Sequence, residues 1–218
     1  MTPVVIAIDG PAASGKGTLA RRLAEHFGYA HLDSGLLYRA AARKLLRAGH
    51  DPGDEALAAR AAADVALPDL ADPALRLEET ARAAGIVAAL PRVRAALVGL
   101  QRSFAASPPG GATGAVIDGR DIGTVICPDA TYKIFVDASP AVRADRRLKE
   151  LQDRGEGSIH SRVLRDMKER DARDRSRAVA PLIPARDALI LDTTALDADA
   201  AFAAALAFIA SRDRSDEA

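Results

Sequence analysis

Residues 10–18 read Gly10-Pro11-Ala12-Ala13-Ser14-Gly15-Lys16-Gly17-Thr18, between an apolar run at residues 4–8 and an amphipathic segment at residues 19–27. A strand, a glycine-rich turn and a helix form the context in which G-x-x-x-x-G-K makes a phosphate-binding loop. Glycines let backbone N–H groups point inward around a polyanion, and a helix that starts near Lys16 adds the positive end of its dipole. We therefore expect residues 10–18 to bind the phosphates of a nucleotide.

Lys16 is expected to reach the β- and γ-phosphates as a point charge. The next residue is Gly17, where the general motif has a serine or threonine that binds Mg²⁺. Thr18, one position later, is therefore the candidate hydroxyl ligand for Mg²⁺. The alternative, a chance glycine-rich turn, does not account for the strand, the spacing and the lysine together.

Length and composition are typical of one globular domain, or of one core with an inserted subdomain: 218 residues, 49% hydrophobic and 28% charged. Lysine plus arginine and aspartate plus glutamate both number 30, so no net field attracts nucleic acid or a membrane. Cys127 is the single cysteine, which excludes an internal disulfide. With no signal-peptide pattern and no 18-residue apolar span, we expect a cytoplasmic protein that does not bind a membrane. We also expect a monomer that does not bind nucleic acid.

Short apolar strands alternate with helical segments along the chain. Strands are expected at residues 4–8, 30–33, 115–117, 132–136 and 188–191. Helices are expected at residues 16–27, 34–49, 55–66, 74–90, 91–104, 140–152, 158–177 and 198–210, with a frayed tail at 211–218. This alternation predicts an α/β fold with a five-stranded parallel sheet flanked by helices, whose ligands gather at the carboxyl ends of the strands.

The segment Asp118-Gly119-Arg120-Asp121 follows one of these strands. Asp118 occupies the strand end at which P-loop proteins place a carboxylate near Mg²⁺. Arg120 projects from a glycine-containing turn and can grip a phosphate through two parallel hydrogen bonds. The plainer alternative is a strand-end turn that carries a surface ion pair.

Two helix starts carry further candidates. Ser34 is expected to cap a helix that bears Tyr38 and Arg39 one turn later, and Arg94 lies in the first turn of a helix that begins at Pro91. Tyr38, Arg39 and Arg94 are candidates to face the ligand cleft. The alternatives are an ordinary cap with a surface arginine, and a solvated first-turn arginine.

Arg170, Arg173, Asp174 and Arg177 share one face if residues 158–177 form a single helix. Three arginines on one face suit the binding of a phosphoanion, and the carboxylate among them suits one further polar group of the ligand. A salt-bridged solvated helix and a basic run for nucleic acid are the alternatives, the second weakened by the interspersed acids.

The four histidines, His26, His31, His50 and His160, are scattered, and we expect structural or surface roles for them. No histidine or cysteine cluster has metal-ligand spacing, and no Ser/His/Asp arrangement is suggested. A phosphate loop, a carboxylate after a strand and arginines on several segments favour phosphoryl transfer, which depends on positioning and charge neutralisation.

Together these residues resemble the bacterial cytidylate kinase family. The resemblance covers residues 9–18, 33–39, 91–94, 118–124 and 168–182, and the patterns D-G-R-D and R-D-x-R-D-R-x-R-x-x-A-P-L are specific to that family among P-loop kinases. It implies a P-loop kinase fold over residues 1–218, with a short acceptor-side insert at about 60–95 and a short lid at about 143–177. It also implies ATP with Mg²⁺ as donor, CMP or dCMP as acceptor, and CDP or dCDP as product.

The resemblance further implies roles for single residues. The candidate catalytic residues are Lys16, Arg120, Asp121, Arg170 and Arg177. The candidate substrate-binding residues are Ser34, Tyr38, Arg39, Arg94, Asp118, Arg120, Asp121, Arg170, Asp174 and Arg177, with Asp174 and Arg94 at the cytosine. Two departures from the family are a short segment, residues 64–74, in place of an inserted β-subdomain, and Gly85 in place of a serine near the cytosine.

Two other functions remain open at this point. One is a kinase of similar fold that acts on another nucleoside monophosphate or on a small metabolite. The other is a regulatory module that binds a nucleoside triphosphate and has no acceptor. Arginines on four separate segments favour a site for an acceptor phosphate over the regulatory module.

Overall fold

The computed structural model describes residues 2–216, which form two compact units. The first unit consists of the chain up to Leu32 and from Pro108 onward, and the second is Asp33–Ser107. The first contains the phosphate loop, whereas the second contains the segment expected to bind the acceptor.

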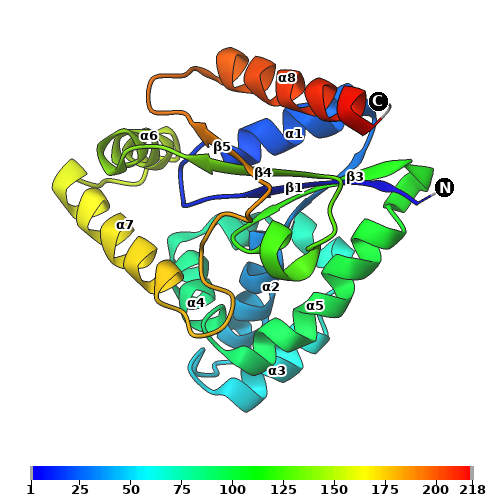
Figure 1. Cartoon of the computed structure of the whole chain (residues 1–218). Coiled ribbons are helices and arrows are strands. Elements are labelled where there is room, and N and C mark those ends of the chain that lie inside the picture. The colour runs from blue at the N-terminus through cyan, green and yellow to red at the C-terminus, as the bar shows by residue number, and fades with distance from the viewer. Residues whose placement is uncertain (1, 217–218) are drawn as a thin grey trace. The chain divides into compact units, whose positions relative to one another are not determined.

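A five-stranded parallel sheet forms the centre of the first unit, as the sequence predicts. Its strands are β1 (Val4–Asp9), β2 (Ala30–Asp33), β3 (Gly114–Gly119), β4 (Tyr132–Asp137) and β5 (Leu189–Asp192). They are ordered β2-β3-β1-β4-β5 (Figure 1). All five predicted strands are present, because each is a short apolar run bounded by turn residues.

The register brings the carboxyl ends of the central strands to one edge of the sheet. Asp9 of β1 pairs with Gly119 of β3 and with Phe135 of β4, and Asp137 of β4 pairs with Asp192 of β5. The loops that follow β1, β3 and β4 therefore start side by side, which is where parallel sheets bind ligands.

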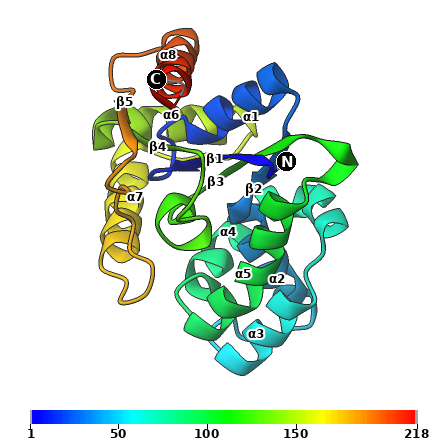
Figure 2. The same cartoon turned by 45° about the vertical axis from the view of Figure 1, so that its right-hand side comes forward.

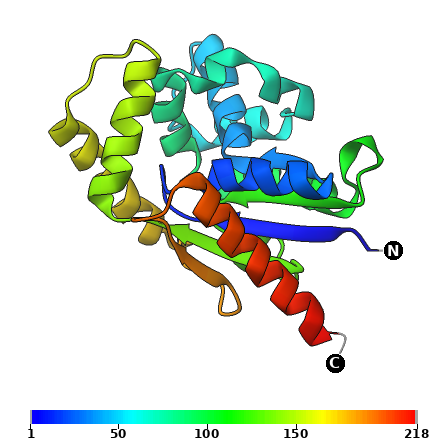
Figure 3. The same cartoon turned by 90° about the horizontal axis from the view of Figure 1, so that it is seen from above.

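Helices α1 (Lys16–Phe27) and α8 (Ala198–Asp216) pack against one face of this sheet (Figures 1 and 3). Their shared core contains Ile6 and Ile8 of β1, Leu23 of α1 and Ile209 of α8. Complete burial of one such side chain contributes about 1.5–3 kcal/mol. This packing fixes β1 and α1, and with them the two ends of the phosphate loop.

The predicted frayed tail at residues 211–218 is wrong for the part that the structure describes. Helix α8 continues to Asp216, and only residues 217–218 lie outside the described chain. The Tyr132 hydroxyl donates a hydrogen bond to Asp213, and the Arg212 guanidinium lies 5.6 Å from the Phe208 ring centre. One hydrogen bond from β4 and one contact within α8 therefore accompany the longer helix.

Helices α6 (Pro140–Asp153) and α7 (His160–Arg175) pack against each other through a small apolar core. The core contains Ala144 and Leu151 of α6 and Val163 and Met167 of α7. Ala12 and Ala13 of the phosphate loop pack against it. The helix pair is thus connected to the loop by apolar contact as well as by the chain.

The predicted helix over residues 158–177 is too long at both ends. Helix α7 begins at His160 and ends at Arg175, and the Leu182 amide donates to the Asp174 carbonyl at 2.9 Å, which turns the chain back. Arg177 therefore lies beyond the helix, so the expectation that it shares one helix face with Asp174 is wrong.

The second unit is helical: α2 (Ser34–Arg47), α3 (Glu55–Ala63), α4 (Glu78–Val87) and α5 (Pro91–Ala106) (Figure 2). Helices α3 and α4 are shorter than predicted, because residues 67–76 form two 3-10 turns, Leu67–Ala71 and Pro73–Arg76, with a proline in the first turn of each. These turns occupy the segment where the family resemblance implies an inserted β-subdomain.

The cap of α2 also differs from the prediction. Asp33, not Ser34, is the N-cap residue, and its carboxylate accepts a hydrogen bond of 3.0 Å from the Gly35 amide. Both residue types cap helices well, so sequence alone does not separate adjacent candidates. Ser34 thereby becomes the first helical residue.

Within residues 2–216, no single helix combines the length and apolar character needed to cross a membrane. Two consecutive segments, Glu78–Val87 and Pro91–Gly111, together meet the criteria of length and apolar composition for a membrane span, but the chain bends by 102° between them.

Candidate active site

The phosphate loop connects the end of β1 to the start of α1. Gly10 has a φ of 152°, and a Cβ there would lie 2.0 Å from the Val136 carbonyl oxygen, so no larger residue fits. Gly15 has a left-handed φ of 93° and precedes α1 without a side-chain cap. Lys16 opens the helix. An uncapped helix start after a glycine-rich loop is a site for an anion.

The carbonyl groups of the loop are held from the protein side. The Ser14 carbonyl accepts hydrogen bonds from Thr193 Oγ1 at 2.8 Å and from Arg146 at 3.4 Å. The Ala12 carbonyl accepts one from Arg143 at 3.3 Å. Arg143 is buried and also pairs with Asp171 of α7 at 2.5 Å. These bonds fix the loop and connect it to α6 and α7.

Asp9 ties β1 to the segment that carries Arg120 and Asp121. Its two carboxylate oxygens accept hydrogen bonds of 2.8 Å from the Ile122 and Gly123 amides. Burial raises the pKa of Asp9 to about 6, although these two bonds and the Arg120 charge favour the ionised form. From the sequence, Asp9 could be assigned only to the end of a strand. No neighbouring residue indicates that its partners are amides more than a hundred positions away.

Asp118, at the end of β3, faces the phosphate loop. Its Oδ1 lies 2.9 Å from Nε2 of His31. Its Oδ2 lies 3.8 Å from the point where a Cβ of residue 17 would be. The residue there is Gly17, so a carboxylate oxygen of Asp118 lies next to the position that carries the Mg²⁺-binding hydroxyl in the general motif.

Thr18 lies on the exposed side of α1, where Arg21 donates a weak hydrogen bond of 3.5 Å to its hydroxyl. The positive charge of Arg21 repels a divalent cation, and the same guanidinium lies 3.9 Å from the point where a Cβ of residue 17 would be. Among residues 2–216, no group of three or more histidine, cysteine, aspartate or glutamate side chains is placed to hold a metal.

Asp174 lies at the centre of a cluster of arginines. Its Oδ2 is 3.1 Å from Arg120 Nε and 4.0 Å from Arg170 Nε, and its Oδ1 accepts a hydrogen bond from Arg177. Burial disfavours the charged form, but Arg120, Arg177 and Arg170 outweigh it and lower the pKa of Asp174. The structure therefore brings together four of the candidate residues from two segments.

Arg173 is the exception among the predicted arginines. Its side chain is exposed, and its Nε donates to the Glu169 carbonyl at 3.4 Å instead of facing Asp174. Arg120 from the β3 loop occupies the place beside Asp174 that sequence reasoning gave to Arg173. The helical pattern could not reveal this, because Arg120 comes from another element.

The second unit holds the candidate residues of α2 and α5. Arg39 donates to the Leu75 carbonyl at 2.8 Å, and Arg94 donates to the Ala88 carbonyl at 3.3 Å. The Arg94 guanidinium lies 5.6 Å from the centre of the Tyr38 ring, within cation–π range. Arg94 is thus a buried, partnered side chain and not a solvated first-turn arginine.

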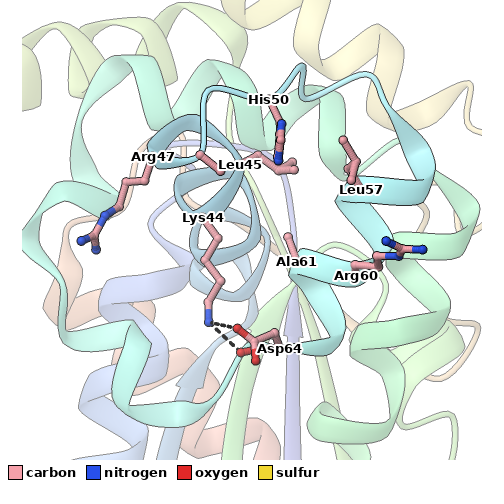
Figure 4. Close-up of a pocket in the computed structure, with 9 residues that line it drawn as sticks. Lys44, Leu45, Arg47, His50, Leu57, Arg60, Ala61 and Asp64 are labelled. Atoms are coloured by element: carbon pink, nitrogen blue, oxygen red, sulfur yellow. Dashed lines mark hydrogen bonds and ion pairs between the residues drawn. The ribbon is translucent and has the colours of Figure 1, made fainter.

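A cavity of about 550 Å³ lies elsewhere in the second unit, between α2 and α3 (Figure 4). Leu45, His50 and Leu57 lie around it, and Lys44 bonds Asp64 at 2.7 Å. That hydrogen bond raises the pKa of Lys44. No candidate site residue lines this cavity, so it is separate from the proposed chemistry.

Comparison with known proteins identifies the family. The family model for cytidylate kinase matches residues 6–211. The cytidylate kinases of Paramagnetospirillum magneticum and Methylocella silvestris are 63% and 60% identical to this chain over 208 residues. These alignments cover 95% of this chain and 98% and 94% of the relatives. The chain belongs to the cytidylate kinase family.

All segments that resemble cytidylate kinases lie inside the matched range, so the resemblance stated from the sequence is confirmed. Two solved structures share the fold: an uncharacterised protein from Eubacterium ventriosum (TM-score 0.54, covering 95% of this chain and 99% of that one) and a gluconokinase from Sinorhizobium meliloti (TM-score 0.50, covering 96% and 93%). Each is 16% identical to this chain, so these two similarities concern the fold alone.

Proposed function

We propose that this member of the cytidylate kinase family transfers the γ-phosphoryl group of ATP to CMP or dCMP, giving ADP and CDP or dCDP, in pyrimidine nucleotide metabolism. The observation that carries the proposal is identity of 63% and 60% to two cytidylate kinases, each over 95% of this chain. The phosphate loop, the buried Asp118 and the arginines around Asp174 supply groups that this reaction requires.

The donor nucleotide is held by the loop from Gly10 to Thr18. Amides of the loop and of the first turn of α1 surround the phosphates, and Lys16 neutralises the group in transfer. Glycine at positions 10 and 15 is required by the backbone itself, as the conformations of both residues show. The reaction then proceeds by positioning and charge neutralisation, without a covalent intermediate.

The residues present suit a Mg²⁺ ion that arrives with the nucleotide. Mg²⁺ in such sites takes one or two carboxylates, with phosphate oxygens and water as its other ligands. Asp118 supplies one carboxylate oxygen beside Gly17, and the Arg21 guanidinium lies near both candidates, 3.5 Å from the Thr18 hydroxyl and 3.9 Å from the point where a Cβ of residue 17 would be. Because Mg²⁺ in such sites takes carboxylate ligands, we assign the protein side of the Mg²⁺ site to Asp118 in preference to Thr18. Bound there, Mg²⁺ would neutralise phosphate charge.

Each unit carries candidate residues for the acceptor nucleotide. In the first unit these are Arg120, Asp121, Arg170 and Arg177 for its phosphate and sugar and Asp174 for the cytosine. In the second unit they are Ser34, Tyr38 and Arg39 on α2, with Arg94 for the cytosine. A charged carboxylate such as Asp174 accepts hydrogen bonds and donates none, which suits the exocyclic amino group of cytosine.

Residues 1–218 then form one catalytic domain, with an acceptor-binding insert at about 60–95 and a lid at about 143–177. The lid contains α6, α7 and the turn at Gly155, which has a left-handed φ of 74°. We place the enzyme in the cytoplasm, where its nucleotide substrates are found, as a monomer.

The test is formation of ADP from ATP and Mg²⁺ with and without CMP, with CDP measured as the second product. A kinase forms ADP and CDP in equal amounts and forms little ADP when CMP is absent. A nucleotide-binding regulatory module would hydrolyse ATP slowly at a rate that CMP does not change, and that result would overturn the proposal.

A further inference from the structure

His31 connects β2 to the carboxylate that faces the phosphate loop. It precedes the end of β2 by two residues, and its Nε2 lies 2.9 Å from Oδ1 of Asp118 at the end of β3. The His31 side chain is 22% exposed and that of Asp118 only 3%. This is therefore a partly buried pair between neighbouring strands of the sheet.

The bond has a defined direction. A carboxylate accepts hydrogen bonds and donates none, so Nε2 of His31 carries the proton and donates it to Oδ1. This bond at Oδ1 is one of the contacts that restrict rotation of the carboxylate about its Cβ–Cγ bond. The other oxygen, Oδ2, then lies toward residue 17, 3.8 Å from the point where a Cβ of that residue would be.

This orientation matters because residue 17 has no side chain. In a loop with serine or threonine at that position, the loop itself supplies the oxygen. In this chain the side-chain oxygen next to residue 17 comes from Asp118 on β3. The direction of that oxygen depends on the contacts that hold the Asp118 carboxylate.

We propose that His31 is a positioning residue for the reaction: it orients Asp118 so that Oδ2 faces the Mg²⁺-nucleotide at Gly17. The proposal rests on the assignment of Asp118 in the proposed function. Partners of this kind, which hold a metal-binding side chain without touching the metal, typically change metal affinity or activity by about 10–100-fold when they are removed.

Two substitutions separate this role from packing. His31→Leu removes the donor and keeps an apolar body, whereas His31→Gln keeps an N–H donor at a similar reach. His26→Gln is the matched control, since His26 is exposed on α1 and packs its ring against the Phe27 and Phe202 rings.

The main readout is binding, not turnover: calorimetric titration of the protein with ADP at increasing Mg²⁺ concentrations. We expect the Mg²⁺ concentration for half-maximal enhancement of ADP binding to rise about tenfold or more in His31→Leu. It should stay within about threefold of wild type in His31→Gln and unchanged in His26→Gln. Steady-state kinetics should show a lower kcat in His31→Leu with the KM for CMP unchanged.

The variant Asp118→Asn distinguishes failure of the positioning role of His31 from failure of the assignment of Asp118 to the Mg²⁺ site. If Asp118→Asn shifts the Mg²⁺ dependence and a folded His31→Leu does not, the positioning role is overturned and the assignment of Asp118 stands. If neither shifts it, the assignment of Asp118 fails and the positioning role fails with it.

A measurement on the wild-type protein covers the case in which His31→Leu does not fold. Nitrogen-15 NMR of the histidine rings should show a protonated Nε2 at His31 that exchanges slowly with solvent and shifts on Asp118→Asn. A His31 ring whose Nε2 lacks a proton would overturn the proposal.

Discussion

Arg120 and Asp174 lie 54 positions apart in the sequence and form an ion pair in which Nε and Oδ2 are 3.1 Å apart. The pair joins the loop after β3 to helix α7. Arg177 and Arg170 add their charges to the same carboxylate and keep its pKa low. A carboxylate held charged in this way presents only acceptor oxygens, and it does so between arginines suited to phosphate.

Asp174→Asn is expected to shift the preference from CMP toward UMP. Cytosine presents an amino donor where uracil presents a carbonyl, and an asparagine can turn its own amide to donate. Correct pairing of this kind contributes about 1–3 kcal/mol of discrimination, or roughly tenfold to over a hundredfold. The measurement is kcat/KM for CMP and UMP in both proteins.

Asp166→Asn serves as the control for this substitution, because Asp166 is a largely exposed acid of the same helix that pairs with Arg162 and Arg165. Its ratio of CMP to UMP should equal that of wild type. An unchanged ratio in folded Asp174→Asn would mean that the base is recognised by other residues and that Asp174 only organises the arginines.

Asp9 is expected to make stability depend on pH between about 4 and 6. Burial raises its pKa from the ordinary value of 3.8 to about 6, so the folded protein binds this proton more tightly than the unfolded chain. The stability contributed by the proton is complete below pH 3.8 and is lost as the pH rises through 6. At 1.36 kcal/mol per pKa unit, the loss is on the order of 3 kcal/mol.

Urea unfolding from pH 4 to 7 checks this expectation. The free energy of unfolding should fall more with rising pH in wild type than in Asp9→Asn, which has no proton to lose. Asp129→Asn, at an exposed position before β4, should keep the wild-type profile. Parallel profiles for wild type and Asp9→Asn would show that the carboxyl titrates alike in the folded and unfolded states.

Lys16→Ala is expected to lose most of kcat while the protein stays folded. Removal of a preorganised charged group from a transition state costs about 3–4 kcal/mol, or several hundredfold. Arg47→Ala, which removes an exposed cation of α2, should retain wild-type turnover. Turnover of Lys16→Ala within tenfold of wild type would exclude the role given to this lysine.

The segment from α6 to α7 is expected to become more protected when both nucleotides bind. Its helices carry many cations, and the left-handed Gly155 lies in the turn between them. Arg143 fixes the base of the segment through the Ala12 and Ala138 carbonyls. Hydrogen exchange over residues 150–165, with and without ATP analogue and CMP, measures the change. Equal protection in the two states would contradict a lid that closes on nucleotide.

Local sequence patterns predicted the parts of the fold that local forces determine. The five strands and the phosphate loop follow from short apolar runs and from glycines at fixed spacing. The helix ends were less accurate: Asp33 replaces Ser34 as the cap of α2, and α7 stops before Arg177. Such ends depend on which of several suitable residues finds a tertiary partner.

Contacts across long sequence separations account for what sequence reasoning missed. The sequence indicated neither the bond between His31 and Asp118 nor the two amides of the loop after β3 that Asp9 binds. Arg120, not Arg173, lies beside Asp174. Each of these pairs joins segments that are distant in the sequence, and local periodicity does not show which distant segments meet.

The central claim, phosphoryl transfer to a cytidine monophosphate, is tested most directly by competition between acceptors. The protein is given limiting ATP with Mg²⁺ and an equimolar mixture of CMP, dCMP, UMP, AMP and GMP, and the diphosphates are separated at early times. Because all acceptors compete for one enzyme, the product ratio equals the ratio of kcat/KM values. The account predicts that CDP and dCDP form the great majority of the diphosphate products. A mixture dominated by UDP, GDP or ADP beyond the amount formed from ATP, or no acceptor-derived diphosphate, would contradict it.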